Sequence, residues 1–300
     1  MPIVPTVWDG HRLDWGRRTF VMGILNITPD SFSRDGLAFA GASREAIVAA
    51  AVARAQRMVS DGAQLLDIGG ESTRPGAAAE APLDPAVERE RVVPVIAALA
   101  VALPPEIVLS IDTYHAATAA AALDAGATLV NDVWGLRGDP ALAPLVAERG
   151  VPVVLMSNLR GARPDESGSE RREEPTGDVA RMLARSLDLA AAAGIASERV
   201  ILDPGLGFGL AGAENLRVLA RLGELRVFGR PLLVGVSRKA HIGQVLGTAV
   251  DDRVEGTAAE VALSIAQGAD IVRVHDVRAM ARVARMADAV VRGWREEDAP

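Results

Sequence analysis

The stretch Pro231-Leu-Leu-Val-Gly-Val236, followed directly by Ser237-Arg238-Lys239, shows the pattern that decides the fold. A short apolar run of this length, closed by a polar cluster, predicts a buried strand. In α/β proteins the catalytic and ligand-binding residues lie at the C-terminal ends of such strands. Lys239 is also the single lysine of the chain, against thirty-one arginines. Because lysine is a compact, tunable point charge and arginine a planar fork, a lysine retained at this place is a candidate functional residue.

The same unit recurs eight times along the chain, each time as an apolar run, a polar or glycine-rich cluster and a helical stretch. Continuous apolar strands that alternate with helices predict a parallel sheet buried on both faces. Eight such units favour a closed (β/α)8 TIM barrel, a single α/β domain over residues 20–300. An open dinucleotide-binding sheet is disfavoured because no Gly-x-Gly-x-x-Gly opens the first helix. The predicted strands are 20–25, 64–68, 107–111, 128–130, 152–156, 200–202, 231–236 and 270–274, and the predicted helices are 44–59, 86–103, 116–123, 141–148, 178–193, 213–222, 257–266 and 279–291.

Two segments lie outside this repeat. Residues 1–19 form an N-terminal extension, for which a hairpin over 8–18 closing the bottom of the barrel and a loose tail are equally compatible with the sequence. Residues 160–175 are charged and turn-rich and have no apolar face, which predicts a solvated loop, with a lid as the alternative.

Composition excludes several classes of function. The chain has no cysteine, so disulfides, thiolate nucleophiles and cysteine-based metal sites are absent. The first residues lack the basic and apolar regions of a signal peptide, and no apolar stretch approaches the roughly 18 residues of a membrane span. We therefore expect a cytoplasmic protein that does not enter a membrane. A net charge of −7 without a basic run disfavours nucleic acid, but converging arginines could still bind a small anionic substrate.

Polar residues stand at the ends of seven of the eight predicted strands. Each has an ordinary explanation: Asp67 could cap a turn, Asp132 a helix, Asn131 could bond a loop and His275 could be structural. Burying so many polar groups without a purpose would cost several kcal/mol. In a barrel they all face one mouth at the C-terminal ends of the strands, so together they indicate a site.

The strand-end residues divide into groups with different chemistry. Asp112, Asn131, Asp203 and Lys239 suit a flat heterocycle rich in N–H donors, because carboxylates accept hydrogen bonds from such an edge and the other two donate. Asn26, Arg74, Arg273 and His275 could bind phosphate or pyrophosphate, with Mg²⁺ held by hard oxygen ligands. The loops 27–36 and 69–76 could close over the mouth. Neither a nucleophile elbow nor a zincin-type His pair is present.

Seven motifs, in order from about residue 20 to 293, resemble those of the dihydropteroate synthase family, the folate-pathway enzymes that sulfonamides inhibit. The motifs are Met22-Gly-Ile-Leu-Asn-Ile-Thr-Pro-Asp-Ser-Phe-Ser33, Asp67-Ile-Gly-Gly-Glu-Ser-Thr-Arg-Pro-Gly76, Ser110-Ile-Asp-Thr113, Val130-Asn-Asp-Val133, Asp203-Pro-Gly-Leu-Gly-Phe208, Ser237-Arg-Lys239 and Arg273-Val-His-Asp276. The first two motifs are long and specific. The resemblance implies a transferase that condenses 6-hydroxymethyl-7,8-dihydropterin diphosphate with p-aminobenzoate, yielding 7,8-dihydropteroate and pyrophosphate, with Mg²⁺ as cofactor.

The resemblance also implies roles for individual residues, with Asp112, Lys239, Arg273 and His275 as the catalytic set. Pyrophosphate would leave first and the aryl amine would then attack, so no side chain needs to be a nucleophile. The pterin would contact Asp112, Asn131, Met156, Asp203, Phe208, Lys239 and Arg273; the diphosphate Asn26, Thr73, Arg273 and His275; p-aminobenzoate Phe32, Arg74, Pro75, Ser237 and Lys239; and Mg²⁺ Asn26 and Asp35.

Three positions depart from the family pattern. Ser157 stands where the family commonly has histidine, Leu210 where it often has lysine, and His241 where it often has phenylalanine. These departures leave open a pterin-binding paralogue with weak synthase activity or none. A pterin-dependent methyltransferase is a further alternative, which the anion-binding residues disfavour. The resemblance also implies a homodimer that pairs through the last helices.

Overall fold

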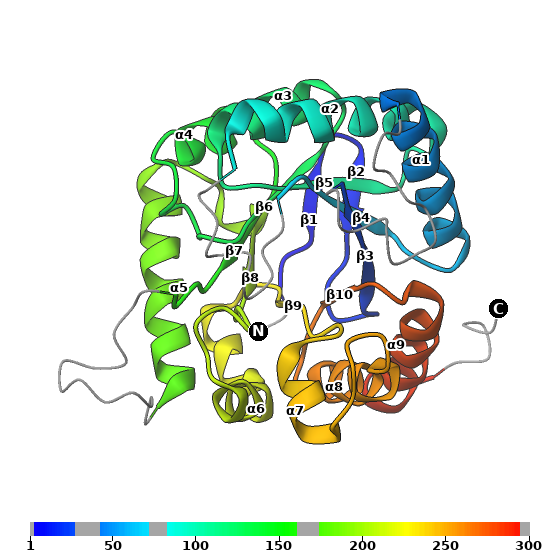
Figure 1. The fold of residues 1–300 in the computed structure, drawn as a ribbon. Helices are drawn as coiled ribbons and strands as arrows, with labels where there is room; N and C mark the ends of the chain where they lie inside the picture. Colours follow the sequence, from blue (N-terminus) through cyan, green and yellow to red (C-terminus); the bar gives the residue numbers. More distant parts are fainter. Residues whose placement is uncertain (1–2, 28–42, 72–82, 161–173, 295–300) are drawn as a thin grey trace.

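Eight parallel strands form a ring in which each strand lies beside its neighbours in the chain (Figure 1). The computed structural model describes residues 3–27, 43–71, 83–160 and 174–294. The first strand of the ring pairs with the last, and a bridge between Leu202 and Leu232 closes the remaining gap. The predicted TIM barrel is confirmed. Its strands are β3 (Phe20–Asn26), β4 (Leu65–Gly69), β5 (Val108–Asp112), β6 (Leu129–Asp132), β7 (Val153–Met156), β8 (Val200–Asp203), β9 (Leu233–Val234) and β10 (Ile271–Val274).

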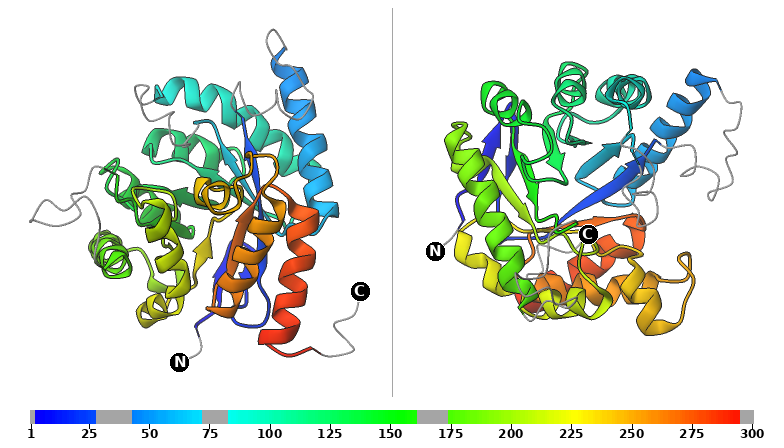
Figure 2. Two further views of the ribbon diagram at one scale, coloured as in Figure 1. Left: turned by 60° about the horizontal axis from the view of Figure 1, so that its bottom comes forward. Right: turned by 60° about the vertical axis from the view of Figure 1, so that its left-hand side comes forward.

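Helices surround the strands as an outer layer (Figures 1 and 2). Their inner faces and the outward faces of the strands share one large apolar core. Local sequence sets several helix starts: Ser43 Oγ accepts the Ala46 N–H at 3.3 Å, and Asp84 accepts the Ala86 N–H at 2.8 Å. The α-helices are α1 (Arg44–Ser60), α2 (Pro85–Ala102), α3 (Ala116–Asp124), α4 (Leu142–Arg149), α5 (Pro175–Ala192), α6 (Gly212–Ala220), α7 (Ala240–Leu246), α8 (Val254–Ala266) and α9 (Val277–Val291), with 3-10 turns η3 (Ser197–Arg199) and η4 (Leu222–Phe228).

A two-stranded hairpin covers the N-terminal ends of the barrel strands. It consists of β1 (Thr6–Trp8) and β2 (His11–Leu13), so it begins and ends earlier than the predicted 8–18 segment. Trp8 and Leu13 are buried in a second apolar core made of the first residues of the barrel strands. The Trp8 indole also donates to the Thr128 carbonyl at 2.7 Å. This plug leaves the opposite, C-terminal end for a site.

The structure corrects the predicted element bounds in three ways. Several strands continue into the polar residues that were expected to follow them, since the backbone of these residues extends the parallel ladder. Strand β9 is much shorter than the predicted 231–236. Helix α7 was not predicted, because it is short and its packing depends on Gly256: a Cβ there would lie 2.3 Å from Ile242 of α7.

Two further expectations from the sequence concern a membrane and the charged segment 160–175. Among the described residues, no helix combines the length and the apolar composition that crossing a membrane requires. Most of the charged segment 160–175 lies outside the described residues, and α5 begins at Pro175.

Candidate active site

A cavity of about 550 Å³ opens at the C-terminal ends of the barrel strands. Most of the residues predicted for the site line it together, although they come from seven different strands or the turns that follow them. Those residues are Asn26, Asp112, Asn131, Met156, Asp203, Phe208, Ser237, Lys239, Arg273 and His275. The other predicted site residues, Phe32, Asp35, Thr73, Arg74 and Pro75, lie outside the described residues.

Asp67 of β4 organises the polar floor of the barrel. Its fully buried carboxylate accepts hydrogen bonds from Ser110 Oγ at 2.5 Å, Asn131 Nδ2 at 2.8 Å and Arg273 Nε at 2.6 Å. The sequence placed Asp67 among the strand-end residues of the mouth, but it indicated no role for this residue beyond turn capping. The signal available was its position at the end of a buried strand, which Asp112 and Asp203 share.

Arg273 of β10 joins two carboxylates across the barrel. Its Nη2 donates to Asp112 Oδ2 at 2.8 Å while its Nε donates to Asp67. Burial, together with the charge of Asp67, raises the pKa of Asp112 to about 8, and the Arg273 charge opposes the shift. Asp112 and Asn131 are register partners on adjacent strands, so the group presents carboxyl, amide and guanidinium functions side by side.

Asp203 ends β8 and begins a turn that only glycine permits. Its Oδ1 accepts the Gly205 N–H at 2.7 Å, and burial raises its pKa to about 6. Gly205 has φ +70°, and a Cβ there would lie 1.8 Å from the Ser157 carbonyl oxygen. Gly209 has φ +87°, and a Cβ would lie 2.3 Å from the carbonyl carbon of Leu159. These close approaches bring Phe208 to the cavity wall.

Two cations lie over the Phe208 ring. Lys239 Nζ lies 4.6 Å and the Arg160 guanidinium carbon 4.4 Å from its centroid, which is the geometry of a cation–π contact. Burial lowers the pKa of Lys239 to about 8, although the Asp203 charge works against this. Arg160 was not predicted for the site, because it begins the charged segment 160–175 and has no strand-end position to mark it.

Ser237 and His275 form the rim of the cavity next to Lys239. Ser237 Oγ accepts the His275 backbone N–H at 3.1 Å and lies 3.0 Å from its Nδ1. This contact fixes the orientation of the imidazole ring.

Asp132 has a structural role after β6. It accepts hydrogen bonds from the backbone N–H groups of Trp134 and Leu136, so it stabilises a turn instead of capping the fourth helix.

Known proteins with similar sequences share this fold. A family model described as pterin binding enzyme matches residues 22–275. Dihydropteroate synthases of Bacillus subtilis and Synechocystis are 42% and 43% identical, with 93% and 98% of this chain and 91% and 95% of theirs aligned. The solved structure of the Xanthomonas albilineans dihydropteroate synthase with 4-aminobenzoic acid is 38% identical, covers 97% of each chain and has a TM-score of 0.82.

This chain belongs to the dihydropteroate synthase family. The resemblance drawn from the motifs is thereby confirmed.

The three departures from the family pattern occupy different places around the dihydropteroate synthase cavity. Ser157 is fully buried, and its hydroxyl has no hydrogen-bond partner among the described residues. Leu210 and His241 both line the cavity. His241 Nε2 lies 2.9 Å from Glu260 Oε1, so the imidazole at this position comes with a carboxylate partner on α8.

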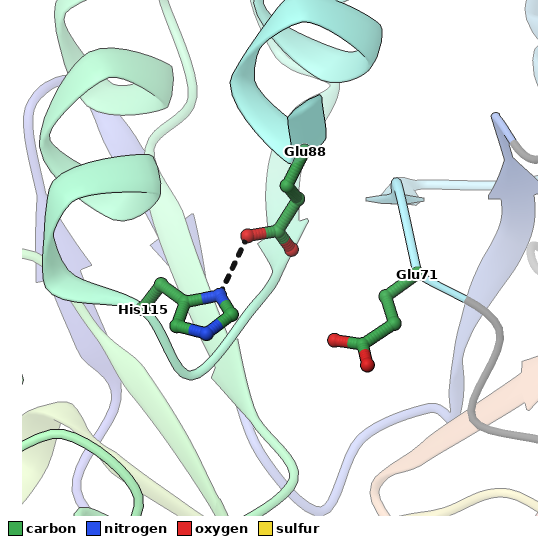
Figure 3. A group of neighbouring side chains, drawn as sticks. All are labelled: Glu71, Glu88 and His115. Carbon is green, nitrogen blue, oxygen red and sulfur yellow. Dashed lines mark hydrogen bonds and ion pairs between the residues drawn. The ribbon is translucent and has the colours of Figure 1, made fainter. Parts of the chain in front are cut away.

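A second group of polar side chains near the site has the composition of a cation site. Glu71 follows β4, Glu88 lies in the first turn of α2 and His115 precedes α3; their ligand atoms lie within 4.8 Å of one another (Figure 3). Glu88 Oε2 is 2.9 Å from His115 Nδ1 and accepts the Thr113 hydroxyl at 3.0 Å. Burial raises the pKa of Glu71. These residues are not among those that line the cavity, and they differ from the Asn26 and Asp35 pair predicted for Mg²⁺.

Proposed function

We propose that this chain is a dihydropteroate synthase that makes 7,8-dihydropteroate and pyrophosphate from 6-hydroxymethyl-7,8-dihydropterin diphosphate and p-aminobenzoate in folate biosynthesis. The observation that carries the proposal is the polar floor of the barrel. Asp112, Asn131 and Asp203 supply acceptors and an amide, and Lys239 and Arg273 supply cations, all in one cavity. This set complements the amino-pyrimidinone edge of a pterin.

The floor explains how a pterin would be oriented. Asp203 and Asp112 would accept from ring N–H and amino groups. Asn131, whose Nδ2 donates to Asp67, lines the same cavity. Met156, Phe208 and Val133 form an apolar cluster beside this floor. A flat ring seated between this cluster and the Arg273 guanidinium has acceptors at its edge and apolar or cationic groups at its faces.

The diphosphate would lie at the rim of the cavity and contact Arg273 and His275. Thr73 stays a predicted contact of the diphosphate. Asn26 fits a place near Mg²⁺: its Oδ1 and Asp112 Oδ2 lie 3.7 and 3.5 Å from where a Cβ on Gly69 would be, so two hard oxygen donors lie close to each other. Asp35 is the second predicted ligand. Bound Mg²⁺ would neutralise charge on the departing pyrophosphate.

p-Aminobenzoate would bind beside Ser237 and Lys239. The related Xanthomonas albilineans enzyme was solved with 4-aminobenzoic acid, which supports this molecule as the second substrate. Phe32, Arg74 and Pro75 stay predictions for the same pocket. The wall also contains His241 in this chain.

The proposed mechanism is dissociative. The carbon–oxygen bond to pyrophosphate breaks first, leaving a positively charged pterin methyl group; the aryl amine then forms the carbon–nitrogen bond and loses a proton. Arg273 and His275 stabilise the leaving group's negative charge. Asp112 lies where positive charge develops, and a carboxyl with a pKa near neutrality ionises readily when a cation forms beside it.

A homodimer is proposed from the surface of α9. Met286 and Val290 lie one turn apart on the same face and are 65% and 73% exposed, and Trp294, just beyond the helix, is 60% exposed. Large apolar side chains gathered on one helix face mark an interaction surface, and a second copy of the chain is the partner we propose. Helix α9 packs against α8 (Figure 2), whose Leu263 is 58% exposed. A cytoplasmic location stays a prediction.

Calorimetric titration with the pterin diphosphate tests the pterin pocket directly. We expect one site per chain, and at least about tenfold weaker binding in Asp203→Asn, because a carboxylate acceptor becomes an amide that also donates. The control is Asp139→Asn, which removes a carboxylate that bonds the Ala116 and Ala141 N–H groups and does not line the cavity. Equal affinity in both variants, or no binding to the unaltered protein, would overturn the assignment.

A further inference from the structure

Helix α8 and the residue before it present three polar side chains to the turn that carries Lys239 and to the first turn of α7, which follows it. Arg253 is the residue just before the helix, and Thr257 and Glu260 follow at spacings of four and seven residues. This spacing places them on one face of the helix. Thr257 is fully buried, and 7% of Glu260 is exposed.

Arg253 and Thr257 hold the backbone of the turn. Arg253 Nη1 donates to the carbonyls of Arg238 at 3.1 Å and Lys239 at 3.2 Å, while its Nη2 donates to the Thr248 carbonyl at 3.2 Å. The Arg238 N–H in turn donates to Thr257 Oγ1 at 3.1 Å. The two peptide groups that flank the Lys239 Cα are therefore both hydrogen-bonded to Arg253, at the N-terminal end of α8.

The turn needs such support because its backbone is strained. Arg238 has φ +57°, a left-handed conformation that is uncommon for a residue other than glycine. Such conformations persist only where the surrounding structure enforces them. The Arg238 side chain is also fixed, by a two-point ion pair with Asp276 at 2.9 and 2.6 Å.

Glu260 holds the next part of the chain. Its carboxylate lies 2.9 Å from Nε2 of His241, in the first turn of α7, the short helix that Lys239 caps. Both side chains are buried. Breaking a buried pair by removing one partner leaves an uncompensated polar group, so the two residues act as one unit.

We infer that Arg253, Thr257 and Glu260 are positioning residues for Lys239, an inference that rests on the proposed function. Lys239 Nζ lies 4.6 Å from the centroid of the Phe208 ring. Because the four-carbon stem has a limited reach, Nζ can take this place only while the backbone of the turn is held where it is. A displacement of about 1 Å at a reacting group can cost on the order of 100-fold in rate. Helix α8 thus determines the geometry of the cation without touching a substrate.

The test uses Thr257→Val, which keeps the shape of the side chain and removes the acceptor for the Arg238 N–H. We expect kcat/KM for the pterin diphosphate to fall at least tenfold and its Kd, measured by calorimetry, to rise. Thr257→Ser keeps the hydroxyl and should retain both values within about threefold. Ser264→Ala is the matched control: its buried hydroxyl lies on the same helix and donates to the Glu260 carbonyl at 2.7 Å, away from the turn.

A merely structural role predicts another result. The positioning role is wrong if Thr257→Val and Ser264→Ala lower Tm by similar amounts and either leave kcat/KM and Kd unchanged or change them by the same factor. Binding can be measured without turnover. The Kd comparison therefore still tests the positioning role when the unaltered protein binds the pterin diphosphate but releases no pyrophosphate. That second outcome would contradict the proposed function alone.

Discussion

At the scale of the residue, Lys239 is the part of the site where charge and shape are most constrained. Its ammonium lies over the Phe208 ring and interacts with the charge of Asp203, and the Gly207 Cα lies so close that a Cβ there would be 3.3 Å from Nζ. A guanidinium fork is too wide for this place. We expect Lys239→Arg to lower kcat by at least about 100-fold, a loss of roughly 2.7 kcal/mol of transition-state stabilisation. Steady-state pyrophosphate release measures it, and near-normal turnover would remove the role assigned to this lysine.

The lowered pKa of Lys239 predicts a pH dependence with a definite sign. The protonated form donates to the substrate, and burial lowers the pKa to about 8, so the active form is lost as pH rises through 8. We expect kcat/KM for the pterin diphosphate to fall about tenfold per pH unit above that value. In Lys239→Arg this alkaline decline should be absent up to pH 10, since a guanidinium keeps its proton. An alkaline limb shared by both proteins would assign the titration to another group.

At the scale of the element, the N-terminal hairpin is part of the barrel core. Trp8 is 3% exposed, and Val7 beside it on the same strand is 52% exposed. Trp8→Ala should cost about 3–5 kcal/mol in the free energy of unfolding, from lost burial and the lost bond to Thr128. Val7→Ala should change it by less than about 0.5 kcal/mol. Urea unfolding measures both, and similar small losses would mean that the hairpin is a loose extension.

Sequence pattern predicts elements better than it predicts their ends or their cross-contacts. The eightfold alternation was sufficient for the barrel, because each strand is buried on both faces and reads as an apolar run. The polar residues at the strand ends could be recognised because each one directly follows an apolar run. Asp67 was underestimated, because its partners Ser110, Asn131 and Arg273 lie on three other strands. Arg253 and Glu260 carry no local signal, since their roles depend on how α8 meets a turn more than ten residues away in the chain.

At the scale of the whole molecule, the exposed face of α9 predicts assembly. We expect light scattering after gel filtration to give twice the 31.3 kDa of one chain. Introducing Met286→Glu with Val290→Glu should give a monomer, because two buried carboxylates without partners would oppose pairing. Val227→Glu, at an 81% exposed position on η4, is the control and should leave the dimer intact. A monomeric unaltered protein would contradict the proposed surface.

The most direct measurement is pyrophosphate release by the purified protein with Mg²⁺, the pterin diphosphate and p-aminobenzoate, each omitted in turn. The account predicts release only when all three are present, with one dihydropteroate formed per pyrophosphate. That result would make Ser157, Leu210 and His241 tolerated variations within a working synthase. Tight pterin binding without any release would contradict the synthase and identify a pterin-binding paralogue instead.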